Sequence, residues 1–186
     1  MANKKSIAVY CGHKFGKNPV YNEQAAKMGR LIGEAKIRLV FGGGNAGLMG
    51  SVAGAARDAG GEVLGITTQH VINMQEPLLE GIKSEVHENL SARKRRMFEL
   101  SDAFCILPGG LGTLDELVDI LVMHQVKESH LPIYFLNTNG YWNILGRVMA
   151  HMQREGFLGD LTQFNMQILE NPEDVIKVYK SRFWTD

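Results

Sequence analysis

The residues best suited to chemistry lie in one stretch, Pro108-Gly-Gly-Leu-Gly-Thr-Leu-Asp-Glu116, where three glycines lead to two carboxylates. Residues 103–107 before it form an apolar run with the length of a buried parallel strand. After it, apolar side chains follow a helical spacing at Leu114, Leu117, Val118, Leu121 and Val122. Glycine lets backbone N–H groups approach a ligand, and the free N–H groups at a helix start attract anions. The order strand, glycine turn, helix therefore predicts a site for a phosphorylated ligand.

The same stretch also has a purely structural interpretation. Thr113-Leu-Asp-Glu116 has the pattern of a capping box, with Thr113 as the N-cap and Glu116 as the third helical residue. Such a cap satisfies free N–H groups and needs no ligand. It also needs no run of glycines before it, so Pro108-Gly-Gly-Leu-Gly112 favours a ligand site over a cap alone.

Two other glycine-containing segments come close to known nucleotide motifs. The segment 12–18 has three residues between its glycines where a P-loop has four, and Asn18 occupies the position of the magnesium-binding Ser or Thr. This excludes a Walker-type NTPase. The segment 42–50 satisfies G-x-G-x-x-G, but it follows the second predicted strand, and Glu62 begins the next strand where a ribose-binding acid would end it.

The signal for NAD is therefore weak. What remains at 42–50 is a second strand-loop-helix corner that suits phosphate, with Gly43 and Gly44 as predicted substrate contacts.

Composition limits the alternatives. The chain has 186 residues, enough for one domain spanning 1–186, and its 20 basic residues equal its 20 acidic ones. Because the chain carries no net charge to attract polyanions, we expect neither nucleic acid nor a membrane as partner. We interpret Arg93-Lys-Arg-Arg96 as a basic helix face near the Pro108 turn. No apolar run suits a membrane span or a signal peptide, which predicts a cytoplasmic protein.

No cluster of residues has metal-ligand spacing, so no metal and no cofactor are predicted. Cys11 and Cys105 lie in or at the end of apolar runs, where free cysteine behaves as a small hydrophobic residue. We interpret His13 and His124 as polar residues at a strand end and on a helix surface.

Strands alternate with helices along the chain, which predicts an α/β fold with a doubly wound parallel sheet and helices on both faces. Strands are expected at 7–11, 38–41, 61–66, around 86, and at 103–107, 132–136 and 166–169. Helices are expected at 19–35, 52–59, 141–154 and 171–179. One further helix is expected to begin at Ser91, and another to follow the Pro108 turn and end at about 127. The small residues of 52–59 indicate close packing. The irregular connection 67–81 is a candidate lid or pocket wall.

Three stretches together resemble the LOG (Lonely Guy) family of cytokinin-activating phosphoribohydrolases, whose members were formerly described as possible lysine decarboxylases. They are Gly42-Gly-Gly-Asn-Ala-Gly-Leu-Met-Gly50, Arg93-Lys94 with Met97, and Pro108 to Glu116. The resemblance implies a modified Rossmann fold, assembled as a homodimer or larger homo-oligomer with the site near a subunit interface. It also implies hydrolysis of AMP or N6-isopentenyl AMP to a free base and ribose 5-phosphate.

The family's catalytic arginine and glutamate fall on Arg93 and Glu116. Its substrate-binding segments fall on Lys94, Gly109, Gly110, Leu111, Gly112, Thr113, Leu114 and Asp115. Breaking the glycosidic bond builds positive charge on the ribose, and a carboxylate beside it stabilises that charge. A helix start would favour the ionised form of Glu116. Arg93 would clamp the substrate or assist departure of the base. Asp115 would be a secondary contact to the ribose hydroxyls, and Glu76 would close the pocket from the connection 67–81.

Three positions depart from the family pattern and bear on the base. His13 replaces a common serine, Leu111 replaces a frequent aromatic residue, and Met123 stands where tryptophan is usual. These positions leave the preferred base open.

Two other functions remain as alternatives. A nucleotide or molybdenum-cofactor carrier, a class that resembles this family, would need the glycine cradle but neither Arg93 nor Glu116. A lysine decarboxylase would need a lysine able to hold pyridoxal phosphate, and Lys94 alone lies near a phosphate-binding turn.

Overall fold

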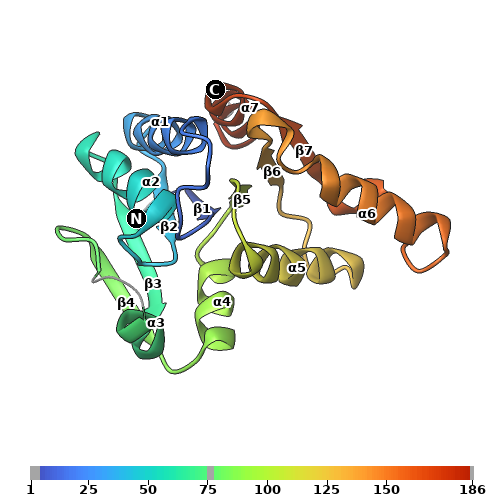
Figure 1. Ribbon diagram of the computed structural model, residues 1–186, viewed down its shortest axis with the longest axis horizontal. Coiled ribbons are helices and arrows are strands. Elements are labelled where there is room, and N and C mark those ends of the chain that lie inside the picture. Colours follow the sequence, from blue (N-terminus) through green and yellow to red (C-terminus); the bar gives the residue numbers. More distant parts are fainter. Residues whose placement is uncertain (1–4, 75–77, 185–186) are drawn as a thin grey trace.

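The computed structural model describes residues 5–74 and 78–184, and within them a seven-stranded parallel sheet lies between two layers of helices (Figure 1). The strand order is β4-β3-β2-β1-β5-β6-β7. The strands are β1 (Ser6–Tyr10), β2 (Arg38–Phe41), β3 (Val63–Thr68), β4 (Lys83–His87), β5 (Ala103–Ile106), β6 (Ile133–Leu136) and β7 (Met166–Leu169). This confirms the predicted α/β class and the doubly wound parallel sheet.

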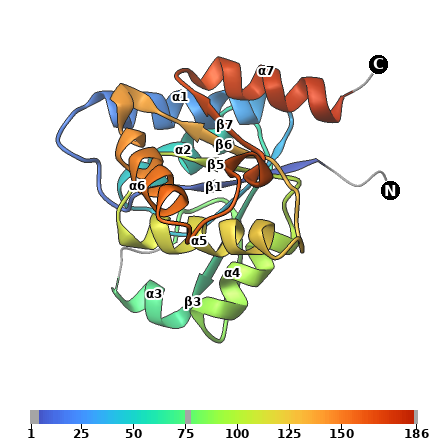
Figure 2. The ribbon, with the colours of Figure 1, turned by 90° about the vertical axis from the view of Figure 1, so that its right-hand side faces the viewer.

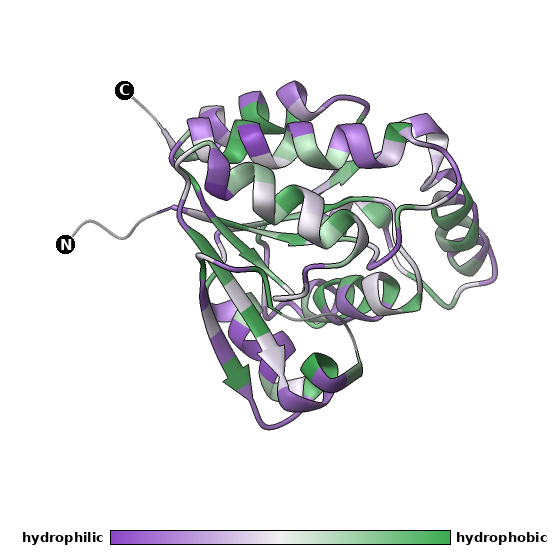
Figure 3. Cartoon of the chain, turned by 60° about the vertical axis from the view of Figure 1, so that its left-hand side comes forward, coloured by the Kyte–Doolittle hydropathy of each residue, from purple (hydrophilic) through white to green (hydrophobic). Residues whose placement is uncertain are grey.

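The central strands β5 and β6, and β1 after Ser6, are continuous apolar runs because both of their faces are covered. Alternate residues of β1 serve the two halves of the core: Ile7 and Val9 pack on one face, and Ala8 and Tyr10 on the other. Figure 3 shows the central strands as hydrophobic along most of their length.

The helices form the two layers. Figure 1 shows α1 (Val20–Glu34), α2 (Gly47–Asp58) and α7 (Pro172–Phe183) on one face, and α4 (Leu90–Glu99) and α5 (Leu111–Gln125) on the other. The remaining helices are α3 (Gln69–Met74) and α6 (Asn143–Arg154), and two short 3-10 turns occupy Thr138–Gly140 and Leu161–Phe164. The predicted close packing of 52–59 is confirmed, because a Cβ on Gly29 of α1 would lie 2.0 Å from the carbonyl oxygen of Val52.

The sheet reverses its winding between β1 and β5, which are neighbours although far apart in sequence. The loops that follow these two strands meet there, since the backbone N–H of Gly12 donates to the carbonyl of Pro108 at 3.0 Å. In open α/β sheets this reversal leaves a crevice at the carboxyl ends of the strands, where ligands bind. The glycine turn of 108–112 forms one wall of that crevice.

The start of α5 differs from the prediction. The helix begins at Leu111 with Gly110 as N-cap, and no side chain makes a capping hydrogen bond there. Thr113 is instead a buried third residue of the helix, so the predicted capping box is wrong. A Cβ on Gly109 would lie 2.1 Å from the Thr113 hydroxyl oxygen, which shows that Thr113 packs against the turn.

Two other boundaries differ. The N-cap of α4 is Asn89, whose side-chain oxygen accepts from the N–H of Ala92 at 2.8 Å, and Ser91 lies inside the helix. Strand β3 begins at Val63, two residues later than predicted, because Gly61 packs in a turn against Gly33.

The connection 67–81 is more ordered than predicted in its first part, which continues β3 to Thr68 and then forms α3. Over residues 5–74 and 78–184, no helix combines the length and apolar character that crossing a bilayer requires.

Candidate active site at the carboxyl ends of β1 and β5

A buried ion pair between Arg93 of α4 and Glu116 of α5 lies at the centre of the site. The Nη2 atom of Arg93 is 3.2 Å from Oε1 of Glu116, and the two side chains are only 12% and 11% exposed. The Nε–H of Arg93 donates to the carbonyl of Ile66, within β3, at 2.9 Å. A Cβ on Gly42 would lie 2.3 Å from Arg93 Nη2, so this glycine makes room for the guanidinium. Strand β3 and helix α5 together therefore fix the arginine.

A small cavity of about 100 Å³ lies between this pair and the start of α5. Its lining comprises Cys11, Gly12, His13, Met49, Val71, Arg93, Gly110, Leu111, Gly112, Thr113 and Glu116. Because no side chain caps α5, the N–H groups of Leu111, Gly112 and Thr113 stay available to a ligand. The cavity, which we call the cradle, thus combines helix-start N–H groups with a guanidinium, and both bind phosphate.

Glu116 is less acidic than the sequence suggested. Burial raises the pKa of Glu116 to about 7, although the charge of Arg93 opposes the shift. The expectation of a helix start that favours the ionised carboxylate fails because Glu116 is the sixth residue of α5, beyond the free N–H groups of its first turn. The carboxyl group is therefore poised to change protonation near neutral pH.

Lys94 does not line the cradle, and its ammonium is bound to carboxylates of α5. Its Nζ lies 2.9 Å from Oδ1 and 3.0 Å from Oδ2 of Asp115, and 2.8 Å from Oδ2 of Asp119. Burial would lower the pKa of Lys94, but the hydrogen bonds to Asp119 and Asp115 outweigh it and raise that pKa. Two carboxylates thus hold the ammonium in its charged form.

Glu116 also borders a larger cavity of about 620 Å³ between α4 and α5. Apolar side chains form much of its wall, including Tyr10, Phe98, Ile120 and Met123. Burial and the nearby Glu116 carboxyl raise the pKa of Tyr10 well above its usual value, so its phenol stays protonated. The carboxyl of Glu116 therefore stands between a phosphate-sized cradle and a chamber wide enough for a substituted base.

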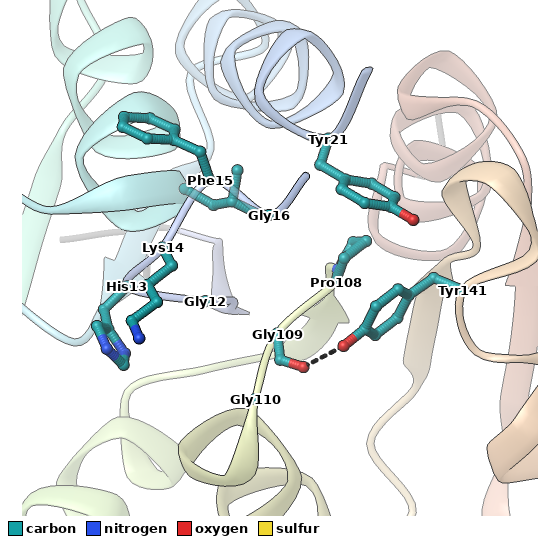
Figure 4. A pocket seen from close by; sticks show the side chains of 11 residues that line it. Gly12, His13, Lys14, Phe15, Gly16, Tyr21, Pro108, Gly109, Gly110 and Tyr141 are labelled. Carbon is teal, nitrogen blue, oxygen red and sulfur yellow. Dashed lines mark hydrogen bonds between the residues drawn. The ribbon is translucent and has the colours of Figure 1, made fainter. Parts of the chain in front are cut away.

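A third cavity, of about 310 Å³, lies on the other side of the 109–110 turn and is lined by His13, Lys14, Tyr21 and Tyr141 among others (Figure 4). The Tyr141 hydroxyl donates to the carbonyl of Gly109 at 2.5 Å, and the rings of Tyr21 and Tyr141 meet edge to face. Tyr141 therefore supports the glycine turn from behind.

The predicted site residues do not all meet at one place. Gly109 lines the third cavity, and Lys94 lines the larger one with its ammonium bound to Asp115. Arg93 and Glu116 meet at the cradle, and Gly110 to Thr113 line it. Gly43 lies next to Thr67, and Gly44 forms a β-bridge with Leu78. Among the described residues, neither glycine lines any of the three cavities. Glu76 lies outside the described residues.

Sequence reasoning missed several residues around the site, namely Tyr10, Phe98, Asp119 and, as support for the turn, Tyr141. The spacing of Asp115 and Asp119, four residues apart on one helix, was the available signal for a shared partner. In the part of the chain that the structure describes, no group of three or more His, Cys, Asp or Glu side chains is arranged to hold a metal ion.

Comparison with known proteins gives a consistent picture. Residues 49–179 match the protein family described as possible lysine decarboxylase. A cytokinin riboside 5'-monophosphate phosphoribohydrolase of Rhodococcoides fascians is 36% identical over 179 residues, covering 95% of this chain and 90% of the relative. The Arabidopsis thaliana cytokinin riboside 5'-monophosphate phosphoribohydrolase LOG7 is 34% identical over 175 residues, covering 93% of this chain and 80% of the relative.

Among solved structures, the molybdenum cofactor binding protein of Rippkaea orientalis matches with a TM-score of 0.71 at 22% identity, covering 96% of this chain and 98% of that one. The Moco carrier protein of Chlamydomonas reinhardtii matches with a TM-score of 0.69 at 18% identity, covering 96% of both chains. At these identities the likeness shows a shared fold.

Proposed function

The chain belongs to the LOG (Lonely Guy) family, and on that premise we propose that it hydrolyses the N-glycosidic bond of AMP or N6-isopentenyl AMP. The products are the free base and ribose 5-phosphate. The observation that carries the proposal is the buried contact of Arg93 and Glu116 beside the uncapped start of α5. A phosphate group, a sugar cation and a leaving base each meet a suitable partner there.

In this mechanism the 5'-phosphate occupies the cradle, bound by the N–H groups of residues 111–113. The ribose then lies over Glu116, whose carboxylate stabilises the positive charge that develops as the bond from C1' to the base nitrogen breaks. Water supplies a hydroxyl group to C1' and a proton to the base. Glu116 also orients this water, because it stands at the junction of the cradle and the larger cavity.

Arg93 acts on the phosphate side. Its guanidinium is held by the Ile66 carbonyl and lines the cradle, so it can bind a phosphate oxygen without reorganising. The base enters the larger cavity, where Phe98 and Met123 offer an apolar surface to an N6 substituent. Met123 is one of the departures from the family pattern, and its place in this wall makes it a determinant of base preference.

The carrier alternative shares the fold and the cradle. We favour hydrolysis because a carrier needs no carboxyl group at the junction of two cavities. A screen of purified, chelator-treated protein against nucleoside 5'-monophosphates decides between the two. Release of ribose 5-phosphate with free adenine or isopentenyladenine supports the enzyme. Tight binding of nucleotide without any product supports the carrier.

Lysine decarboxylation finds no support at Lys94. A lysine that forms a Schiff base must lose its proton readily, whereas hydrogen bonds to Asp119 and Asp115 raise the pKa of Lys94. We expect no absorbance at pyridoxal wavelengths in the purified protein.

We also propose that the protein forms a homodimer or larger homo-oligomer through α5 and α6. Both helices expose apolar stripes to solvent: Leu111, Val118 and Val122 on α5, and Ile144, Val148 and Met152 on α6. Figure 2 shows the two helices on the same side of the molecule. Exposed apolar patches of this kind are typical of protein interfaces. The stripe on α5 adjoins Glu116, which supports a site near the interface.

A further inference from the structure

A fourth cavity, of about 390 Å³, lies at the amino ends of β6 and β7, whereas the cradle lies at the carboxyl ends of β1 and β5. Its wall comes from the end of α5, the segments that precede β6 and β7, and the end of α7. The lining residues are His124, Lys127, His130, Thr162, Gln163, Asn165 and Arg182. Among these described residues every ionisable side chain is a base, so we call this cavity the basic cavity.

The two strongest bases of the basic cavity have no carboxylate partner. Lys127 and Arg182 are both exposed, and neither forms an ion pair with an Asp or Glu of residues 5–74 and 78–184. Arg182 contacts only the ring of its neighbour Phe183 as a cation, at 5.9 Å from the ring centroid. The carboxylate next in sequence to Lys127, that of Glu128, lines the larger cavity between α4 and α5. The positive charges of this cavity are therefore not neutralised by the protein around them.

A simpler role for these bases is to complement helix ends, since Lys127 follows α5 and Arg182 lies in the last turn of α7. Backbone groups already close α5, because the N–H groups of Lys127 and Glu128 donate to the carbonyls of His124 and Met123 at 3.0 and 2.9 Å. Two helix ends together carry roughly one negative charge. Lys127 and Arg182 exceed this charge, so the cavity stays positive.

His124 is the buried polar side chain of the basic cavity. Its Nδ1 lies 2.8 Å from the Phe164 carbonyl oxygen, which can only accept, so Nδ1 carries the hydrogen. Its Nε2 is buried and makes no hydrogen bond within the described residues. Burial lowers the pKa of His124 and the charge of His130 acts in the same direction, whereas the backbone of Phe164 and Leu131 opposes the shift. A buried nitrogen without a hydrogen-bond partner, in the wall of a cavity, indicates a missing partner such as a ligand.

We propose that the basic cavity binds a phosphate-bearing small molecule, about the size of a sugar phosphate, through Lys127 and Arg182. A phosphate monoester carries more than one negative charge at neutral pH and offers three acceptor oxygens. These match the guanidinium fork, the ammonium and the Thr162 hydroxyl, and the cavity volume is within the range of small-molecule sites. The inference goes beyond the proposed hydrolysis and does not depend on it.

The basic cavity and the cradle lie at opposite ends of one helix. Helix α5 begins at the cradle with Leu111 and ends at Gln125, next to the basic cavity, after 15 residues. At 1.5 Å per residue the two sites are roughly 20 Å apart, too far for one small ligand to occupy both. Each chain therefore has two separate places for a phosphate group.

NMR of the histidine ring resonances tests the two places separately. His13 lines the cradle, whereas His124 and His130 line the basic cavity. Inorganic phosphate and ribose 5-phosphate, added separately, should shift the resonances of His124 and His130 in a saturable way, and ribose should not. Bound phosphate should also raise the pKa of His124, because a nearby negative charge favours the imidazolium.

A double variant, Lys127→Gln with Arg182→Gln, removes the two charges from exposed positions that contribute little to the core. It should weaken phosphate binding at His124 and His130 by tenfold or more, as expected for lost charged hydrogen bonds, and leave the response of His13 as in wild type. Lys177→Gln is the matched control, since Lys177 is an exposed base of α7 that does not line the basic cavity. This control should bind phosphate as wild type does.

Two outcomes would overturn the proposal: ribose 5-phosphate that shifts His13 alone, or a double variant whose His124 and His130 respond as in wild type. The histidine resonances report binding without turnover. Saturable shifts of His124 and His130 that the double variant loses therefore support the basic cavity even if the protein hydrolyses no nucleotide.

Discussion

Arg93 Nη2 lies 3.2 Å from Glu116 Oε1, and this contact joins two helices at the point where the phosphate cradle meets the larger cavity. The pair is nearly buried, so removing either partner leaves a polar group poorly solvated. A substrate that brings its phosphate to Arg93 and its ribose to Glu116 engages both members at once. The resting contact therefore holds the two groups in place for the reaction.

Arg93→Lys should lower kcat/KM by about 10²-fold or more, since a lysine keeps the charge but lacks the planar fork that reaches both the Ile66 carbonyl and Glu116. Steady-state kinetics with AMP measure the loss. Arg30→Lys, on the exposed face of α1, is the control and should retain wild-type kinetics. Full activity in Arg93→Lys would show that the fork is not used.

Gly42→Ala should impair turnover although residue 42 itself contacts no substrate in our account. A Cβ there would lie 2.3 Å from Arg93 Nη2 and would push the guanidinium off Glu116. We expect a loss in kcat/KM on the order of tenfold or more, since a misplacement of about 1 Å can cost 10²-fold. Gly54→Ala is a matched control because a Cβ at that helical position meets nothing within 4 Å. Equal activity of the two variants would contradict the positioning role of Gly42.

The rate should rise with pH through about 7. Burial raises the pKa of Glu116 to about 7, so the carboxyl group is protonated and neutral below that pH and charged above it. Only the charged form stabilises a sugar cation, so activity is lost as pH falls. The nucleotide phosphate itself titrates near pH 6, and kcat at saturating substrate should therefore be measured beside kcat/KM. A rate that falls as pH rises through 7 would instead indicate that Glu116 acts as an acid.

Val122→Asp should weaken self-association, because it places a charge in the middle of the apolar stripe on α5. Light scattering after size exclusion should show a shift from oligomer to monomer at micromolar concentration. Val86→Asp, an equally exposed apolar residue on the edge strand β4, is the control and should leave the mass unchanged. A monomeric wild-type protein would contradict the proposed oligomer.

The sheet and its order of elements could be predicted because apolar runs such as 103–107 identify buried strands directly. The face of a helix was harder to assign. Val118 and Val122 fit the predicted stripe of α5 but are exposed, since hydrophobicity alone does not distinguish a core from an interface. His124 was expected on the helix surface, yet it is 1% exposed and its Nδ1 lies 2.8 Å from the Phe164 carbonyl oxygen.

The sequence singled out residues of the candidate site but not their contacts. Arg93 and Glu116 were both predicted as site residues, and their resting contact depends on how α4 and α5 pack, which no local pattern encodes. The binding of Lys94 to Asp119 has the same origin. The protonation of Glu116 could not be predicted either, because the true helix start at Leu111 places it beyond the first turn, where burial outweighs the helix dipole.

The most direct test of the account compares wild type with Glu116→Gln in two assays on the same preparations. Chromatography should show base and ribose 5-phosphate from AMP with wild type, and a loss of about 10³-fold in kcat with the variant. Calorimetry should show that ribose 5-phosphate still binds the variant within a fewfold of wild type, because the cradle N–H groups are intact. Turnover by Glu116→Gln at the wild-type rate would contradict the claim that this carboxylate stabilises the departing sugar cation.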